Sequence, residues 1–497
     1  MNLKGLDEVI LNKHVADTIL EDALSFAEQM EVHKAHVCML WEQNIISQSD
    51  ARAILVALKS IEEDGYESIP QLPGLTDLYS NLEEFLIQKI GLDIGGRIHT
   101  GRSRNDMNLT IERMYIRKLT LSLAQSIFAA MHELLKTAKE HVGTVMPGYT
   151  HHSQHAQPTT LGHYLLSVYY NLERDLERLD ACYKHTNICP MGGAALTGTS
   201  FDINRDRVAS LLGFNRSMTH TIDATSSLDF ALEAAAATCV LISNIGRFAE
   251  SMLLWSMYET GMIKIVAKYC SYSTIMPQKR NPVALETLRI EGDWGYGTLS
   301  SMFNATKAFT PGNGREPGFI VSSCIQIITR MTNAVYLFAG IISSLEVNKE
   351  RCRELADNGL GSMTDLADAM VRDKGLSFAA AKKIVGDIVM VANEKHIDCR
   401  KYSPALIDAS AVKIIGKPIG IAEGEIQDIL DSERNVNRRK TPGGPSFNEV
   451  TNMILACEVD VRKLADVWKN KELALQESAQ KLQKLVDSVV MATPDSK

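Results

Sequence analysis

Hydrophobic residues recur at spacings of three and four along most of this 497-residue chain, and the alternating pattern typical of strands is rare. The pattern is clearest in Ser226–Gly261, the longest of the helices that we predict in the interior of the chain. Its regularly spaced apolar positions are Ile242, Ile245, Phe248, Met252 and Trp255. This spacing places them on one side of a helix, and we expect that side to be buried.

The same periodicity predicts five long helices in the middle of the chain. They are Met107–His141, Thr159–Thr186, Ser226–Gly261, Val283–Lys307 and Phe319–Leu345. Helices of this length with one apolar face each are expected to pack as an elongated bundle. They carry more apolar surface than one bundle can bury, which predicts an oligomer.

Shorter helices are predicted on the N-terminal side of this bundle. Asp17–Asn44 is expected to be helical with a polar break at Glu28–Val32. Ser47 is suited to cap the start of the next helix, because its hydroxyl can accept a hydrogen bond from a backbone N–H of the first turn. Asp77–Ile90 is a further helix that ends at Gly91.

Helices also predominate after the bundle, at Asp365–Val371, Ser377–Asn393, Ala422–Leu430 and Ser446–Val490. The whole pattern predicts an all-α protein. We divide it into an N-terminal helical region, 1–105, a central long-helix bundle, 106–347, and a C-terminal helical region, 348–497.

Charge and composition exclude several classes of function. The net charge is −8 and no run of Lys and Arg forms a basic stripe, which disfavours binding to nucleic acid or to a membrane surface. We find no signal peptide, and the most apolar window, Ala231–Ile245, is too short to span a bilayer and contains Glu233. The nine cysteines include no Cys-x-x-Cys pair, so we expect reduced thiols, a cytoplasmic location and no zinc site.

The most reactive set of side chains lies in Ser271–Pro282, where two prolines interrupt any helix. Ser273, Lys279 and Asn281 together can remove a proton and bind the anion that forms. For an arbitrary polar loop the alternative, an exposed turn without function, would be favoured.

A second stretch of polar residues, His99–Asp106, is rich in hydrogen-bond donors suited to a carboxylate or phosphate. The alternative there is a polar turn that caps the following helix through Asn105 or Asp106.

Several separated motifs resemble those of the argininosuccinate lyase branch of the fumarase/aspartase superfamily, in the same order. The matching stretches are Asp77–Glu83 with His99–Asp106, Pro147–His163, Pro190–Thr199, Ser273–Pro282, Leu366–Asp368 and Arg438–Gly444. The Ser273–Pro282 stretch is long and therefore specific. The resemblance implies an all-α subunit of three domains with a central five-helix bundle. It also implies a homotetramer whose active sites are shared between subunits, acting on a small molecule without metal or organic cofactor.

The resemblance also assigns chemical roles. Superfamily members release fumarate by removing a proton from the carbon next to a carboxylate, which needs a base and a dense set of donors. It implies Ser273 as the base and Lys279 with Asn281 as ligands of the carboxylate. It implies a histidine on the leaving-group side, held by Glu286. The second carboxylate of the substrate would be bound by Ser103, Arg104, Asn105 and Thr150.

The position of that histidine is ambiguous between His151 and His152. Counting forward from Gly148 selects His151, whereas counting back from Pro158 selects His152, because the chain has one residue more than the usual spacing. We prefer His152, since the segment before Pro158 is expected to be held at a helix start. His155 and His163 are interpreted as structural.

The sequence departs from the family pattern at several places. Tyr272 replaces the usual glycine before the catalytic serine, and the N-terminal Arg-Phe loop is not recognisable in Met1–Lys13. In the family, the segment that corresponds to Lys307–Pro317 usually supplies a Tyr, a Gln and a Lys. Here only the position of that Lys keeps its positive charge, as Arg315. The half of the site that forms fumarate is therefore matched better than the half that recognises the guanidino end.

We predict a carbon–nitrogen lyase that cleaves an N-substituted aspartate to fumarate and an amine or guanidine. Argininosuccinate is the first candidate, and a related aminodicarboxylate of specialised metabolism is the alternative. A non-catalytic, crystallin-like structural protein is a third reading. It is disfavoured by the retention of Ser273, Lys279, Asn281 and Glu286.

Overall fold

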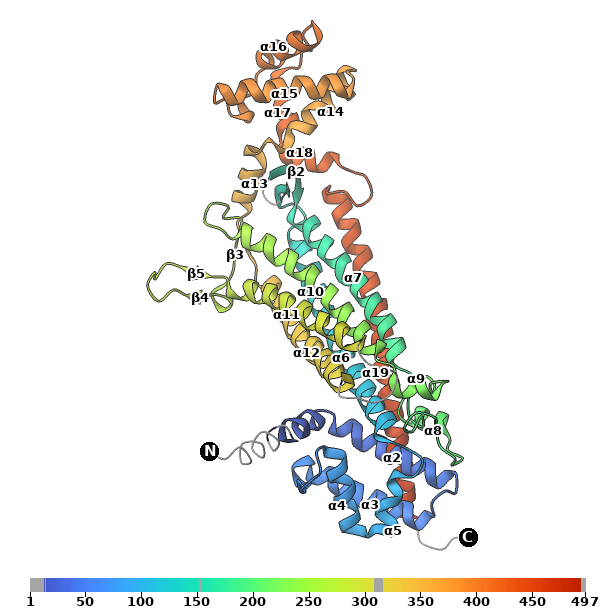
Figure 1. Cartoon of the computed structure of the whole chain (residues 1–497). Helices are drawn as coiled ribbons and strands as arrows, with labels where there is room; N and C mark the ends of the chain where they lie inside the picture. Colours follow the sequence, from blue (N-terminus) through green and yellow to red (C-terminus); the bar gives the residue numbers. More distant parts are fainter. Residues whose placement is uncertain (1–12, 14, 152–153, 308–315, 493–497) are drawn as a thin grey trace.

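The computed structural model shows an elongated, all-α protein with a long helical bundle and a smaller helical region at each end (Figure 1). It describes residue 13 and residues 15–151, 154–307 and 316–492. His152 and Arg315, two of the predicted site residues, lie outside the described residues.

The five predicted long helices form the central bundle. They are α6 (Arg104–Glu140), α7 (Leu161–Thr186), α10 (Asp229–Trp255), α11 (Val283–Thr306) and α12 (Glu316–Ser343). The apolar positions that predicted the buried side of α10 are all at most 4% exposed. Phe248 packs edge-on against Trp255 and Phe338, with ring centroids 5.7 and 6.0 Å apart. Truncating an aromatic side chain in such a core costs about 3–5 kcal/mol of stability.

A second core lies at the N-terminal end of the bundle, around α2 (Phe26–Glu42), α3 (Gln48–Asp64), α4 (Leu78–Ile90) and α5 (Leu92–Gly95). Ser47 caps α3 as predicted, accepting a hydrogen bond from the Asp50 N–H at 3.1 Å. The predicted break at Glu28–Val32 is wrong. The chain turns at residues 24–25, and Glu28–Val32 lies inside α2, where its backbone hydrogen bonds are regular.

Within the bundle the longest helix is α6, with 37 residues, and not the predicted Ser226–Gly261, of which Asp229–Trp255 forms α10. The longest described helix is α19 (Phe447–Met491), with 45 residues, close to the predicted Ser446–Val490. It spans roughly 68 Å. It runs back along the bundle, and its last turns bring Leu482, Val486 and Val489 into the N-terminal core (Figure 1). The division into three regions remains a prediction, with α19 linking the third region to the first.

The C-terminal region has its own small core, built on α14 (Met363–Lys374), α15 (Phe378–Glu394), α16 (Pro404–Ile415) and α17 (Glu423–Leu430). The periodicity predicted α14, α15 and α17. It missed α16, which begins with a proline at its first position, and the short helices α8 (Arg205–Leu211), α9 (Thr221–Ser226), α13 (Lys349–Asn358) and α18 (Ser432–Arg438).

Three small antiparallel strand pairs interrupt the helices. The strands are β1 (Val145–Thr150) with β2 (Gln154–Thr160), β3 (Ile263–Lys264) with β6 (Glu346–Val347), and β4 (Ser271–Tyr272) with β5 (Arg280–Asn281). The β1–β2 pair was not predicted, because its residues do not alternate between polar and apolar and its register shifts between Pro147 and Tyr149. Two of the pairs carry predicted site residues.

Two described helices, α10 and α12, are long and apolar enough to cross a membrane. The length argument applied to Ala231–Ile245 is therefore wrong, since that window is part of a longer apolar helix. Burial distinguishes a core helix from a membrane-spanning helix better than length does. In each helix 56% of the most apolar window is buried inside the protein, as expected for core helices of a bundle.

Candidate active site

The hairpin β4–β5 projects from the side of the bundle (Figure 1). Ser273 directly follows β4 and is the first residue of the loop that joins the two strands. The Ser273 Oγ accepts hydrogen bonds from the backbone N–H groups of Met276 at 3.1 Å and Ile275 at 3.4 Å. Two amide donors on one hydroxyl oxygen favour its deprotonated form. The hairpin thus supplies the stabilisation that a serine base needs.

Lys279 and Asn281 lie on the return side of the same hairpin. The backbone N–H of Ser273 donates to the Lys279 carbonyl at 3.4 Å, which ties the two sides together. Asn281 Nδ2 donates to Ser271 Oγ, also at 3.4 Å. The loop therefore holds the Ser273 and Lys279 backbones together and places the Asn281 amide beside Ser271. The fourth predicted residue of this region, Glu286, is exposed in the first turn of α11.

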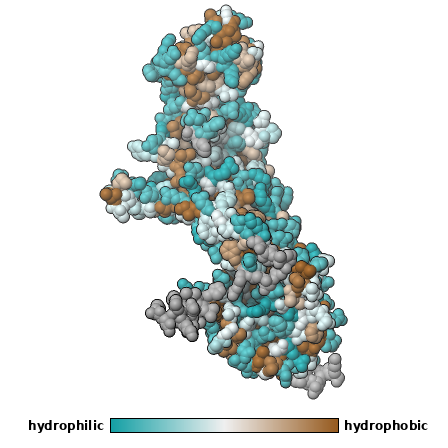
Figure 2. Space-filling view, viewed as in Figure 1, coloured by the Kyte–Doolittle hydropathy of each residue, from teal (hydrophilic) through white to brown (hydrophobic). Residues whose placement is uncertain are grey.

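The outer side of this hairpin is apolar and uncovered. Ile275 is 84% exposed and Tyr272 63% exposed, and Figure 2 shows apolar side chains at the tip of the projection. Tyr272, which stands where glycine was expected, lies under the Arg280 guanidinium, 6.0 Å from it. Exposed apolar residues on a projecting loop are typical of a surface that another chain covers.

Cys270, three residues before Ser273, behaves as a passive thiol. Its Sγ donates to the Ile265 carbonyl at 3.6 Å, and burial raises the pKa of its thiol. A raised pKa keeps the thiol protonated and weakly nucleophilic.

Thr150 and His151 lie at the exposed end of β1, on the far side of the bundle from the start of α6. His151 has a φ of 49°, an uncommon left-handed conformation for a non-glycine residue.

The contacts of His163 agree with the structural role that we predicted for it. Its Nδ1 lies 2.8 Å from Thr159 Oγ1, and its Nε2 lies 2.9 Å from the Gly443 carbonyl oxygen. No three His, Cys, Asp or Glu side chains among the described residues are grouped so as to hold a metal ion.

His155 packs edge-on against Tyr149, with ring centroids 5.1 Å apart, and burial lowers its pKa. A lowered pKa keeps this imidazole neutral near pH 7. The contact agrees with the structural role that we predicted for it.

The start of α6 holds the third group of predicted residues. Ser103 is the N-cap and forms a capping box with Asp106, so Ser103 caps this helix and not Asn105. Arg104 Nη1 donates to Asp77 Oδ2 at 2.6 Å, and Asn105 Nδ2 donates to the Ala195 carbonyl at 2.9 Å.

Buried groups behind this turn hold it in place. The Asp106 carboxylate accepts hydrogen bonds from the backbone N–H groups of Gly192 and Ala194, at 2.7 and 2.9 Å. Arg102 is 5% exposed and donates to His33 Nδ1 at 3.0 Å and to the Tyr79 hydroxyl at 3.4 Å. Burial lowers the pKa of His33, so this imidazole is neutral and can accept the bond.

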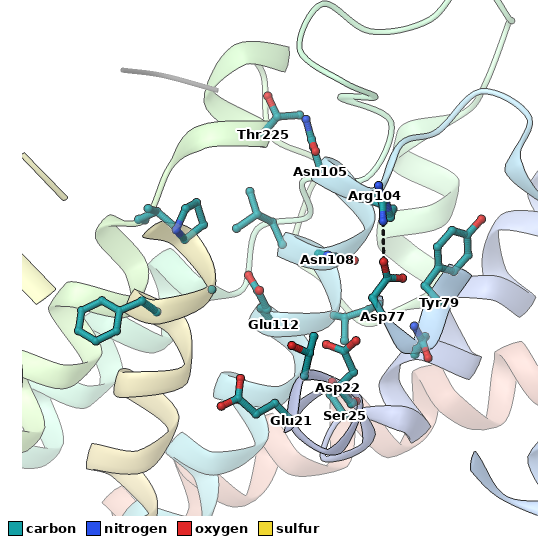
Figure 3. A pocket seen from close by; sticks show the side chains of 18 of the residues that line it. Glu21, Asp22, Ser25, Asp77, Tyr79, Arg104, Asn105, Asn108, Glu112 and Thr225 are labelled. Carbon is teal, nitrogen blue, oxygen red and sulfur yellow. Dashed lines mark hydrogen bonds and ion pairs between the residues drawn. The ribbon is translucent and has the colours of Figure 1, made fainter. Parts of the chain in front are cut away.

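A cavity of about 600 Å³ opens beside Arg104 and Asn105 (Figure 3). Its volume suits a small organic ligand. Its titratable walls are Glu21, Asp22, Asp77, Tyr79 and Glu112. Asp77 belongs to a motif identified in the sequence, whereas Asp22 and Glu112 are distant in the chain and belong to none, so the sequence did not point to them.

Two carboxyl groups in this cavity have raised pKa values. Burial, with added repulsion from Asp22, raises the pKa of Glu112 to about 8. Burial also raises the pKa of Asp22 to about 6, opposed by a hydrogen bond from the Leu78 N–H. Strongly shifted carboxyl groups in a cavity are typical of binding sites.

A single chain does not bring the three groups of predicted residues together. Arg104 begins α6, whereas Thr150 and His151 follow its other end, and 37 residues of helix separate the ends by roughly 55 Å. No hydrogen bond or ion pair joins Glu286 to His151, both of which the structure describes. Any site that uses all three groups must therefore combine more than one copy of the chain.

The chain is similar to known lyases over most of its length. The lyase family model matches residues 10–292, and the model of the argininosuccinate lyase C-terminal domain matches residues 362–437. Argininosuccinate lyase of Methanocaldococcus jannaschii is 34% identical over 94% of this chain and 99% of its own length. That of Methanosarcina mazei is 35% identical over 90% of this chain and 89% of its own.

Solved structures give the same result. EDDS lyase in complex with formate is 31% identical, with a TM-score of 0.87 over 97% of this chain and 95% of its own. A class II fumarase from Schistosoma mansoni shares the fold, at 17% identity and a TM-score of 0.69, over 83% of this chain and 90% of its own. The chain therefore belongs to the argininosuccinate lyase family.

Proposed function

We propose that this protein is a carbon–nitrogen lyase that eliminates an amine from an N-substituted aspartate and releases fumarate. The observation that carries the proposal is the Ser273 hydroxyl, which accepts hydrogen bonds from two backbone N–H groups in the hairpin that also carries Lys279 and Asn281. This combination of a base and carboxylate ligands suits proton removal next to a carboxylate. The family membership supports the same reaction class.

In the proposed reaction, Ser273 Oγ takes the proton from the carbon adjacent to the substrate carboxylate. The electron pair forms the double bond of fumarate, and the carbon–nitrogen bond breaks with its electrons going to nitrogen. Lys279 and Asn281 bind the doubly charged carboxylate that develops. A histidine, His151 or His152, gives a proton to the leaving nitrogen, held by Glu286 of another subunit. Ser103, Arg104, Asn105 and Thr150 bind the second carboxylate, and Arg315 adds charge on the leaving-group side.

Argininosuccinate remains the first candidate substrate, because the relatives named above are argininosuccinate lyases. The similarity to EDDS lyase supports the alternative, a different N-substituted aspartate. A crystallin-like structural role is disfavoured, since such a protein has no need of an amide-stabilised serine in an exposed hairpin.

We further propose a cytoplasmic homotetramer. The roughly 55 Å between the ends of α6 supports this proposal, because one copy cannot bring Arg104 and Thr150 into one site. Exposed apolar side chains on the bundle offer contact surface for them, at Val240, Ile290, Tyr296, Phe303, Phe319 and Tyr336. All nine cysteines are free thiols, as expected of a reducing compartment.

The proposed reaction is tested with a panel of N-substituted aspartates. Purified protein is expected to increase the ultraviolet absorbance of fumarate with argininosuccinate or another member of the panel. The reverse reaction, fumarate with arginine or other amines, is run in parallel. Absence of fumarate release and of fumarate consumption across the panel would favour the structural role.

Substituting each of the two neighbouring histidines tests which one donates the proton. We expect His152→Asn to lower kcat about 10²-fold or more, because asparagine cannot transfer a proton. His151→Asn is expected to have a smaller effect. Steady-state kinetics of both variants, with His163→Asn as a structural comparison, decides the matter. A larger loss of kcat in His151→Asn than in His152→Asn would assign the proton donor to His151.

A further inference from the structure

The hairpin β1–β2, whose free end carries Thr150 and His151, has only two short strands. Such a hairpin is marginally stable by itself, so its position depends on what packs against it. Here the support comes from the C-terminal region. Helix α13 packs against β1, and α18 and the 3₁₀ turn Leu360–Ser362 pack against β2 (Figure 1). Two predicted site residues are thus held by a part of the chain that carries none of the others.

His155 lies at the centre of this contact. It is paired with Tyr149 across the two strands, and its ring packs edge-on against the Tyr149 ring, with an angle of 82° between the ring planes. On its other side the ring lies against the backbone of Gly359, the residue that ends α13. Among the described residues, none forms a hydrogen bond with the His155 ring, so packing alone orients it.

Gly359 leaves no room for a side chain beside this ring. A methyl group on Gly359 would lie 2.0 Å from Nδ1 and 2.8 Å from Cε1 of His155, far closer than two such atoms can approach. The backbone of Gly359 has a φ of −75° and a ψ of 154°, which any residue can adopt. The close approach of the His155 ring therefore requires glycine here, and the backbone conformation does not.

The chain on both sides of Gly359 is itself held in place. Ser432 Oγ donates to Asp357 Oδ1 at 2.5 Å, and Asn435 Nδ2 donates to Ser362 Oγ at 3.0 Å. Ser432, Asn435 and Ser362 are all buried, where breaking a hydrogen bond is costly. Gly359 thus forms a rigid stop for the ring.

We propose that His155 is a positioning residue of the active site. Clamped between Tyr149 and Gly359, it transfers the fixed position of the C-terminal region to Thr150 and His151 at the free end of the hairpin. The inference rests on the proposed function, in which Thr150 binds a substrate carboxylate and a histidine of this hairpin protonates the leaving nitrogen. A displacement of about 1 Å of such a group can lower the rate about 10²-fold.

A double-mutant cycle between His155 and Gly359 tests the clamp. Gly359→Ala forces the ring to rotate about its Cα–Cβ bond, towards solvent and away from Tyr149, and His155→Ala removes the ring. Each change is expected to lower kcat about tenfold or more. The double variant should stay within about twofold of either single variant, because all three lack the same contact. Losses that multiply, or a normal kcat in Gly359→Ala, would overturn the inference.

Two other glycines provide matched controls. Gly386, inside α15, has open space where a methyl group would be added, so Gly386→Ala should match the wild-type protein. A methyl group on Gly361 would lie 2.4 Å from the Ala156 carbonyl oxygen, a backbone atom that no side-chain substitution removes. Gly361→Ala should therefore lower kcat further when it is added to His155→Ala, whereas Gly359→Ala should not.

His155→Phe separates packing from proton transfer. Phenylalanine keeps a planar ring that can pack against Tyr149, but it cannot donate a proton. We expect it to recover most of the activity that His155→Ala loses, with the pH profile of kcat unchanged. If His155→Phe were as inactive as His155→Ala, the imidazole itself would act in the reaction, and the positioning role would be wrong.

Thermal unfolding separates positioning from stability. Each variant is assayed well below its Tm, so that kcat reports on folded protein. If His155 had only a structural role, His155→Ala and Gly359→Ala would lower Tm and leave the kcat of the folded protein unchanged. That result would overturn the inference.

Failure of the inference and failure of the proposed function can be told apart. If fumarate is released and Gly359→Ala has a normal kcat, the inference fails and the lyase remains. If the wild-type protein releases no fumarate from any compound, the proposed function fails, and hydrogen–deuterium exchange still tests the clamp. Gly359→Ala is then expected to speed exchange in Val145–Thr160 about tenfold, with no further effect when His155 is alanine. Exchange as slow as in the wild-type protein would reject it.

Discussion

Ser273→Ala is expected to lower kcat about 10³-fold or more while leaving the fold intact, because the base that removes the carbon-bound proton is lost. The hairpin that carries Ser273 projects from the bundle, and the hydroxyl contacts the backbone of its own turn at Met276 and Ile275. Its removal costs little packing. Steady-state release of fumarate, together with circular dichroism and thermal unfolding, provides the measurement.

Ser271→Ala is the matched control for this variant. It deletes one hydroxyl from the same hairpin, two residues away, whose side-chain contact is the 3.4 Å bond from Asn281. We expect its kcat to remain within a few-fold of the wild-type value. If Ser273→Ala retained a near-normal kcat, Ser273 would not be the base, and the histidines at the end of β1 would become the candidates.

Mixing two inactive variants is expected to restore activity. Ser273→Ala and Arg104→Leu each remove one part of the site, and the first residue lies in the projecting hairpin while the second lies at the start of α6. If the parts of one site come from different chains, a mixed oligomer contains some sites in which both are intact. Random assembly at equal amounts predicts that about a quarter of the sites are complete.

The experiment requires subunit exchange, by mild denaturation and refolding of the mixture or by co-expression. Activity is compared with that of each variant treated in the same way alone. As a control, the double variant Ser273→Ala, Arg104→Leu mixed with either single variant lacks complete sites in any arrangement. No gain of activity in the first mixture, despite proven exchange, would mean that Ser273 and Arg104 act from the same chain.

Much of the fold could be read from local patterns. The periodicity located the ends of the five bundle helices to within three residues, except that α10 ends at Trp255 and not at Gly261, because one-sided apolar spacing determines which face of a helix is buried. The periodicity did not predict elements whose formation does not depend on regularly spaced apolar residues. The register shift within β1–β2 and the turn at residues 24–25 leave no regular pattern, and the short helices of the C-terminal region contain too few turns to show one.

The candidate site likewise contains residues that the sequence could place and residues that it could not. Ser273, Lys279 and Asn281 lie in one hairpin, so the sequence alone placed them in one segment, and their chemistry stays a prediction that the family resemblance implies. Asp106, expected as a possible cap, completes the capping box with Ser103, and its carboxylate also accepts hydrogen bonds from two further backbone amides. Glu112 lies inside α6, and nothing in its local pattern distinguishes it from a surface glutamate.

By itself, the sequence determined the helical architecture through local periodicity, and its resemblance to a known family implied the proposed reaction. Only the tertiary structure showed that Gln29, Asp22 and Glu112 line one cavity beside Arg104, and that Thr150 lies at the opposite end of α6. The reason is physical. Helical periodicity records burial within about two turns, whereas a cavity and the distance between two groups depend on how segments far apart in the chain pack together.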